Sequence, residues 1–393
     1  MKFPALVGEL VAGITLGVIF HHYSSTFPVL SNLPENEVFK GLTDLAIFFL
    51  MLLAGVELRP KDIVKASGPA FAIAVGGMIV PLMAGMGLGI VFLPESSLKM
   101  AQALFLGTAL AITAVPVSVK ILMDLKLLDT KIGKTIVSAA LFDDILSLVL
   151  LAVLTAILAN GEIPGVDRLL LLVGKVILFF ITTSVLGLYV LPALHKLAAR
   201  FKSDEFEFSA LLMVSFLFAL LAEELGMHFI LGAFLAGLFF VKRIMSDEVY
   251  DTIKASLTSW TMGFFAPIFF ASIGLHLDLA AISEIPLFLS MLLLAAFLGK
   301  LVGAGLPALA VGFTPAESIG IGSAMSARGA VELIIATIAL EAGLFNHPDP
   351  APPEVSFLFS AIVIMALVTT LVTPVLMRFS IGNPGHNRAQ HID

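Results

Sequence analysis

Apolar residues are grouped in long runs along most of the chain, and short polar segments separate these runs. A helix needs about 20 predominantly apolar residues to cross the hydrocarbon core of a membrane. By this criterion the sequence predicts twelve membrane-spanning helices. Their expected bounds are 5–21, 39–57, 67–93, 100–123, 132–159, 167–194, 208–224, 226–241, 257–277, 285–311, 317–343 and 355–378.

Basic residues are distributed unevenly over the loops that connect these predicted helices. Fifteen lie on one set of alternating segments: Lys2, Arg59, Lys61, Lys65, Lys126, Lys131, Lys134, Lys196, Arg200, Lys202, Lys242, Arg243, Lys254, Arg378 and Arg388. The other set holds only Lys40, Lys99 and Arg168. Cytoplasmic loops are enriched in Lys and Arg. The pattern therefore predicts an even number of spans, with both termini in the cytoplasm.

The composition supports an integral membrane protein and excludes several other classes. Hydrophobic residues make up 59% of the 393 residues and charged residues 13%, with a mean hydropathy of +1.05. A soluble domain carries about 25% charged residues. The chain has no cysteine, which rules out disulfides and thiolate metal sites. The net charge of −7 comes without a basic tract, so no nucleic-acid partner is expected.

Two carboxylates and one amine lie in the middle of predicted spans, where an ionisable group is costly and is functional by default. Asp143 and Asp144 are adjacent in Phe142-Asp-Asp-Ile-Leu, and Lys300 lies in Phe297-Leu-Gly-Lys-Leu-Val-Gly. Neighbouring side chains on a helix point about 100° apart, so the two aspartates can share a cavity while they meet different partners. Such a pair with one cationic partner can exchange protons near physiological pH.

Arg328 and Glu332 form a second set of charges within the span 317–343. They are four residues apart, a spacing at which side chains on one helix are neighbours. We expect a structural ion pair in which each neutralises the other. Direct contact with a transported cation is the alternative.

Two of the predicted spans contain residues that interrupt a helix. Pro116 follows Gly107-Thr-Ala and Thr113 in the fourth span, and Gly320, Gly322 and Gly329 lie in the eleventh. Proline removes a backbone donor, and Thr113 can satisfy the freed carbonyls or bind an ion. Interrupted helices at corresponding places in two halves indicate a transporter site near the membrane midplane. The correspondence requires two three-span units, spans 3–5 and 10–12.

With these residues in view, the chain resembles the monovalent cation:proton antiporter-2 family, in particular its NapA-type bacterial sodium/proton antiporters. The resemblance extends over nearly the whole chain. It rests on Pro4-Ala-Leu-Val-Gly-Glu-Leu, Ala54-Gly-Val-Glu-Leu, Leu106-Gly-Thr-Ala-Leu with Thr113, Phe142-Asp-Asp-Ile-Leu and Gly299-Lys. Family members have thirteen spans, and this chain begins at what resembles their second.

The resemblance implies an all-α polytopic membrane protein with two inverted repeats, in which discontinuous helices four and eleven cross. It implies an ion-translocating core over 67–159 and 285–379, and dimerisation or scaffold helices over 1–66 and 200–256. A linker helix over 167–199 and a short cytoplasmic tail over 380–393 complete the expected organisation. The expected assembly is a homodimer in a bacterial or archaeal plasma membrane, in contact with lipid.

The resemblance also assigns roles to the intramembrane residues. Asp144 is implied as the principal carrier of the cation and the proton, and Asp143 as the second carboxylate, which pairs with Lys300. Thr113 is implied as a supporting ligand, so that Asp144, Asp143 and Thr113 together hold Na⁺. Oxygen ligands suit a hard monovalent cation.

We therefore expect a secondary antiporter, not an enzyme, that exchanges Na⁺ or Li⁺ for protons by alternating access. No ATP motif is present and no cofactor is expected, so ion gradients drive the exchange. The alternatives are a K⁺/H⁺ antiporter or a K⁺ efflux system of the same family. An intramembrane protease is disfavoured because the chain has neither His-Glu-x-x-His nor Gly-x-Ser-x-Gly. An organic-anion symporter on a related fold is a further alternative.

Overall fold

A computed structural model describes most of the chain. It covers residues 36–57, 68–113, 130–160, 166–190, 204–240 and 247–381, together with the single residues 12, 15, 16, 19, 33, 118, 122 and 127. Within these ranges the side chains of some helical residues, including Asp144, are not described. The first predicted span, 5–21, and the loop 196–202 lie outside the described part.

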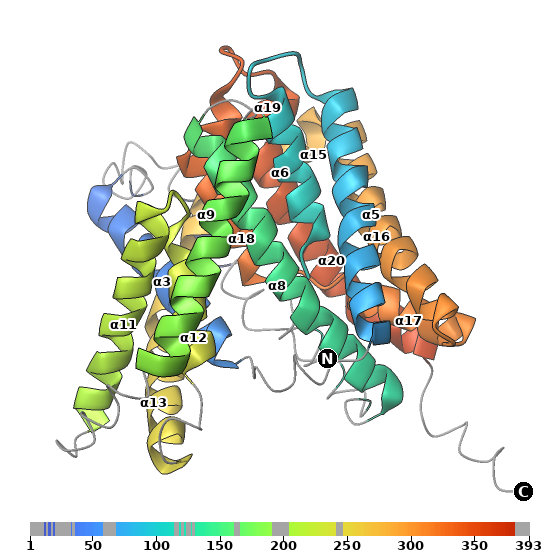
Figure 1. The fold of residues 1–393 in the computed structure, drawn as a ribbon. Coiled ribbons are helices and arrows are strands. Elements are labelled where there is room, and N and C mark those ends of the chain that lie inside the picture. The colour runs from blue at the N-terminus through green and yellow to red at the C-terminus, as the bar shows by residue number, and fades with distance from the viewer. Residues whose placement is uncertain are drawn as a thin grey trace, which may run out of the picture. The chain divides into compact units, whose positions relative to one another are not determined.

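Every regular element in the described part of the chain is a helix (Figure 1). The helices before residue 200 are α3 (Glu37–Glu57), α5 (Gly68–Phe92), α6 (Lys99–Ala111), α8 (Lys131–Asn160) and α9 (Val166–Val185), which continues as the π-helix η2 (Leu186–Val190). Next are α11 (Asp204–Glu224), α12 (Phe229–Phe239), α13 (Asp247–Trp260), the π-helix η3 (Thr261–Phe265), α14 (Ala266–His276) and α15 (Ala281–Glu284). The last are α16 (Pro286–Ala310), α17 (Pro315–Ala324), α18 (Ala330–Glu341), η4 (Leu344–Asn346), α19 (Pro353–Ser356) and α20 (Leu358–Ile381).

Five helices in the described residues are long and apolar enough to cross a membrane: Glu37–Glu57, Gly68–Phe92, Glu248–His276, Pro286–Ala310 and Leu358–Ile381. The third begins well before the predicted span 257–277. The exposed side chains of its first turns are mostly polar, but Tyr250, Ile253 and Leu257 are buried. The helix therefore extends beyond the apolar run from which the span was predicted. The total of twelve spans stays a prediction.

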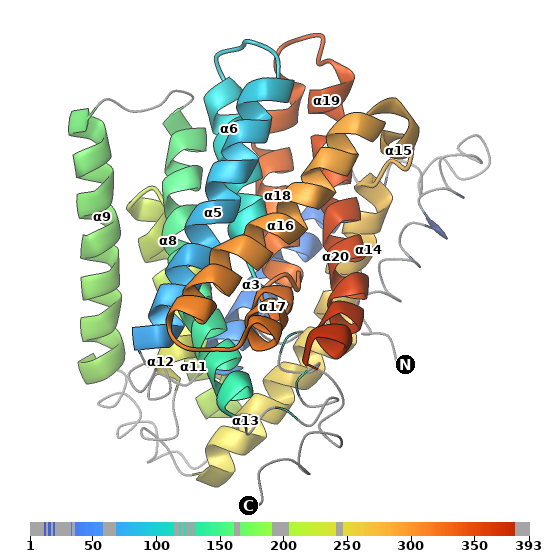
Figure 2. The same ribbon diagram turned by 90° about the vertical axis from the view of Figure 1, so that its right-hand side faces the viewer.

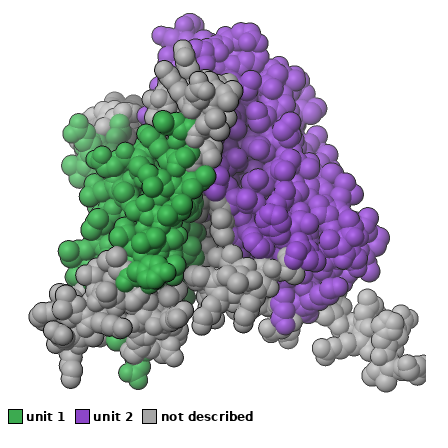
Figure 3. All heavy atoms as spheres, viewed as in Figure 1, with its two compact units in different colours: residues 1–61, 155–160, 164–277 green, residues 62–154, 161–163, 278–393 purple. Residues whose placement is uncertain are grey.

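The chain divides into two compact units, which Figure 3 colours separately. Unit 1 contains residues 1–61, 155–160 and 164–277. Within it the backbones of α3 and α12 are in contact. A Cβ added at Gly237 of α12 would lie only 2.2 Å from Leu52 O of α3, so a larger residue would not fit there. Phe48 stacks on Phe216 of α11, with ring centroids 4.5 Å apart. Unit 1 is thus a helical bundle closed by small residues and aromatic pairs.

Unit 2 contains residues 62–154, 161–163 and 278–393. In it α5 lies between α6 and α16 (Figure 2). A Cβ at Gly76 would lie 2.3 Å from Gly303 O, and one at Gly85 would lie 2.6 Å from Gly107 Cα. Glycine at these positions is what allows both helices to approach α5 so closely. The approach sets the position of Lys300 on α16, one turn from Gly303.

Candidate cation site

The predicted break in the fourth span is a helix end inside unit 2. Helix α6 ends at Ala111 after 13 residues, and Ile112 follows with extended backbone angles of φ −72° and ψ 146°. The last turn of a helix leaves carbonyl oxygens without intrahelical donors. All residues from Ala109 to Thr113 are buried, so these oxygens need partners from elsewhere in the protein. Residues 114–117, including Pro116, lie outside the described part.

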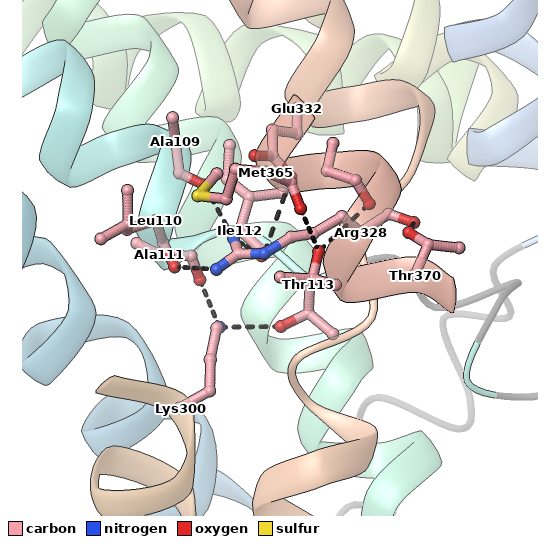
Figure 4. Close-up of polar contacts among 12 residues, drawn as sticks. Ala109, Leu110, Ala111, Ile112, Thr113, Lys300, Arg328, Glu332, Met365 and Thr370 are labelled. Carbon is pink, nitrogen blue, oxygen red and sulfur yellow. Dashed lines mark hydrogen bonds and ion pairs between the residues drawn. The ribbon is translucent and has the colours of Figure 1, made fainter. Parts of the chain in front are cut away.

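Arg328 supplies most of those partners (Figure 4). Its Nη1 donates to Ala109 O at 2.7 Å and also to Ile112 O, and its Nη2 donates to Leu110 O at 2.6 Å. The Arg328 side chain is 1% exposed. The positive charge also faces the negative end of the helix dipole, which is favourable at a helix C-terminus. Arg328 therefore acts as the C-terminal cap of α6.

Lys300 occupies a group of oxygens at the same helix end. Its Nζ donates to Ala111 O and, at 2.7 Å, to Thr113 Oγ1. Asp143 Oδ2 lies 3.4 Å from the same Nζ. Lys300 and Asp143 are both fully buried. The ammonium is thus held by a carbonyl, a hydroxyl and a carboxylate, with the hydroxyl closer than the carboxylate.

The second break lies between the end of α17 at Ala324 and the start of α18 at Ala330. Thr113 Oγ1 donates to Met325 O and Ser118 Oγ donates to Ala324 O, both at 2.8 Å. These side chains from the first break therefore satisfy carbonyls of the second, while Arg328 from the second break satisfies carbonyls of the first. The two breaks are joined by hydrogen bonds in both directions.

Glu332 lies in the first turn of α18 and is fully buried. Its Oε2 is 3.7 Å from Arg328 Nε. Neither carboxylate oxygen, nor Arg328 Nε, has a hydrogen-bond partner in the part of the chain that the structure describes. The two residues expected as an ion pair are neighbours, but the hydrogen bonds of Arg328 go to α6.

Of the three residues predicted to hold Na⁺, two are described in full. Thr113 and Asp143 both contact Lys300. The backbone of Asp144 belongs to α8, but its side chain lies outside the described residues. The described residues contain no cluster of three or more His, Asp or Glu residues that could hold a metal ion.

The sequence pattern did not reveal Ser118, or Arg328 as a cap of α6. The sequence does show an arginine between small residues in a span that also contains glycines. This pattern indicates a helix interruption that contains a charge. It does not identify backbone carbonyls as the acceptors.

Comparison with known proteins identifies the family. Residues 1–378 match the family model described as sodium/hydrogen exchanger, transmembrane. The chain belongs to this family. The predicted resemblance to cation:proton antiporters is confirmed, and with it the prediction of a membrane antiporter that exchanges a monovalent cation for protons. The family consists of transporters and not of enzymes.

Individual relatives agree with this assignment. The Na(+)/H(+)-K(+) antiporter GerN of Bacillus cereus is 31% identical over 379 residues, which are 96% of this chain and 90% of that protein. The Na(+)/H(+) antiporter of Enterococcus hirae is 29% identical over 383 residues, covering 96% and 91%. The solved structure of the sodium proton antiporter MjNhaP1 from Methanocaldococcus jannaschii has the same fold, with a TM-score of 0.66 at 17% identity over 95% of this chain and 96% of that one.

Proposed function

We propose that this antiporter exchanges cytoplasmic Na⁺ or Li⁺ for external protons at a site formed by Asp143, Asp144 and Thr113. The observation that carries the proposal is the set of oxygens around Lys300, namely Ala111 O, Thr113 Oγ1 and the Asp143 carboxylate. Carbonyl, hydroxyl and carboxylate oxygens are the ligands of a hard cation. In the absence of a transported ion, the ammonium of Lys300 takes the place of that cation.

The arrangement supports competition as the basis of coupling. A buried charge is costly unless it is paired, so the carboxylates need a cation, a proton or Lys300 at all times. Na⁺ binding at Asp144 would compete for Asp143 and release Lys300. Proton binding would expel Na⁺ and restore the Lys300 contact. Because one site is neutralised by either ion, each crossing carries one of them, and the two fluxes are coupled.

We also propose that unit 2 is the ion-translocating core, with two inverted repeats whose discontinuous helices cross at the two breaks. The hydrogen bonds that join α6 to the break between α17 and α18 support this reading. Residues 1–66 and 200–256 would form the dimerisation scaffold and 167–199 the linker. The loop charge pattern supports cytoplasmic termini, with 380–393 as a cytoplasmic tail.

Exchange of K⁺ for protons is the second candidate. It is favoured by one observation, since the relative GerN is an Na(+)/H(+)-K(+) antiporter by name. The same oxygens would serve both ions, and the distinction is one of cavity size.

Replacement of Asp144 tests the site. Asp144→Asn keeps the shape of a carboxylic acid but cannot carry charge or release a proton. In proteoliposomes, proton release driven by Na⁺, Li⁺ or K⁺ should fall to the level of empty vesicles. Asp251→Asn makes the same change at an exposed position of α13 and should retain wild-type exchange. An Asp144→Asn variant that still exchanges Na⁺ at close to the wild-type rate would show that another group is the carrier.

A further inference from the structure

Buried helical hydroxyls in this protein follow a common pattern. Most of them donate to the carbonyl four residues earlier on their own helix, as Ser and Thr do when no other acceptor is offered. The residues that do so at 2.7–3.1 Å are Thr108, Thr183, Ser215, Ser323, Thr337, Thr369 and Thr373.

Ser147 departs from this pattern. It lies on α8, its side chain is 2% exposed, and its Oγ has no hydrogen-bond partner among the described residues. The buried hydroxyls of Thr261, in unit 1, and Ser318, on α17, share this property, but neither lies on the helix that carries Asp143. The carbonyl four residues earlier belongs to Asp143, but the hydroxyl does not use it. A buried hydroxyl without a partner is destabilising, because it has lost its water and gained nothing in return. Alanine at this position would avoid that cost.

The position of Ser147 explains what the hydroxyl can reach. Residues 143 and 147 are four apart on one helix, so their side chains emerge from the same face about 6 Å apart along the axis. Both side chains are buried in unit 2. A neutral oxygen is therefore held one helical turn from the carboxylate that contacts Lys300.

The ligands already assigned leave room for another oxygen. Thr113 Oγ1 donates to Met325 O and accepts from Lys300 Nζ, so it can bind a cation only after Lys300 leaves. A dehydrated hard cation needs several oxygens, and two carboxylates with one hydroxyl are a small set. A cation bound near Asp143 would therefore need a further neutral oxygen ligand.

We propose that Ser147 Oγ is an additional ligand of the transported cation, beside Asp143 and Asp144. The inference rests on the proposed cation site. It identifies the additional neutral ligand as the hydroxyl of Ser147, which lies one turn from Asp143 toward the C-terminal end of α8.

The test compares Ser147→Ala with Ser215→Ala. Ser215 is also a fully buried helical serine, but its Oγ donates to Leu211 O at 2.7 Å, and it lies in unit 1. Two quantities are measured on each purified protein. The first is the half-saturating Na⁺ concentration for proton release in proteoliposomes, with Li⁺ and K⁺ in parallel. The second is the melting temperature in detergent without these cations.

A ligand role predicts opposite changes in the two variants. Loss of one neutral ligand should raise the half-saturating Na⁺ concentration of Ser147→Ala about five- to tenfold. Its melting temperature without cation should stay at the wild-type value or rise, because an unpaired polar group has been removed. Ser215→Ala should lose thermal stability and keep the wild-type half-saturating concentration.

Two results would overturn the proposal. One is an unchanged half-saturating concentration in Ser147→Ala while the wild type exchanges normally. The other is a loss of thermal stability like that of Ser215→Ala, which would make the hydroxyl structural. A wild-type protein that responds to none of the three cations would overturn the proposed site itself, and the two failures are therefore distinguishable.

Discussion

Replacement of Arg328 by methionine should unfold the region of the two breaks more readily than any other change of a single charge in unit 2. The variant keeps an unbranched, apolar side chain but removes the guanidinium. The carbonyls of Ala109, Leu110 and Ile112 then lose their donors, and Glu332 loses the cationic neighbour at 3.7 Å. All of these groups are buried, so water does not readily replace the lost contacts.

The magnitude follows from the contacts. A hydrogen bond to a charged group contributes about 1.5–3 kcal/mol, and breaking one partner of a buried ion pair costs about 3–5 kcal/mol. Relaxation of the site and protonation of Glu332 reduce the sum, so we expect a loss of about 4 kcal/mol. For a protein of this size that corresponds to a fall in melting temperature of about 5 °C. Glu332→Gln should cost about 1 kcal/mol or less, because the carboxylate makes no hydrogen bond within the described residues and Arg328 keeps the three α6 carbonyls as partners.

The melting temperatures of the purified proteins, measured in detergent buffer without Na⁺, Li⁺ or K⁺, test this prediction. The set is Arg328→Met, Glu332→Gln, the double variant and, as a control, Arg378→Met at an exposed position. The double variant should melt close to Arg328→Met, because the α6 carbonyls still lack donors. If Glu332→Gln were as damaging as Arg328→Met and the double variant recovered the wild-type value, the ion pair and not the cap would be the role of Arg328.

Two further predictions concern α16. Lys300→Gln keeps a donor for Thr113 Oγ1 but leaves Asp143 without a positive partner, so exchange in proteoliposomes should lose its stimulation by an imposed membrane potential. If the membrane potential stimulates exchange as strongly as in the wild type, Lys300 only neutralises Asp143 and takes no part in charge coupling. Gly303→Val should lower the yield and melting temperature of the protein, because a Cβ there would lie 2.5 Å from Gly76 O. Gly87→Ala, where an added Cβ meets nothing within 4 Å, should be tolerated, and equal stability of the two variants would contradict the packing argument.

The long apolar helices were predictable from sequence to within a few residues. Helices α5 and α16 begin and end close to the predicted 67–93 and 285–311, because a run of about 25 apolar residues has few other stable states in a membrane. The start of α13 was not predictable in this way. Its sequence contains many polar residues, and the burial of Tyr250, Ile253 and Leu257 is what makes it part of the bundle.

The charged residues proposed for the site stand out in the sequence because an ionisable group in an apolar span is costly. Their partners were harder to find. The acceptors of Arg328 are backbone carbonyls 216–219 residues away in the chain, and every residue has such a carbonyl. The i,i+4 spacing correctly identified Glu332 as a neighbour, but spacing alone does not say which contact of Arg328 is the stronger.

The mutual hydrogen bonds of the two breaks have a consequence for transport. Arg328 holds the end of α6, while Thr113 and Ser118 hold the end of α17. A shift of one broken helix alone would leave buried carbonyls without donors on both sides, at a cost that grows with each orphaned group. A conformational change that carries both broken helices, Lys300 and Asp143 together avoids that cost. We therefore expect the alternation of access to move the two breaks as one body, with the ion exchanged for Lys300 inside a site whose backbone frame stays intact.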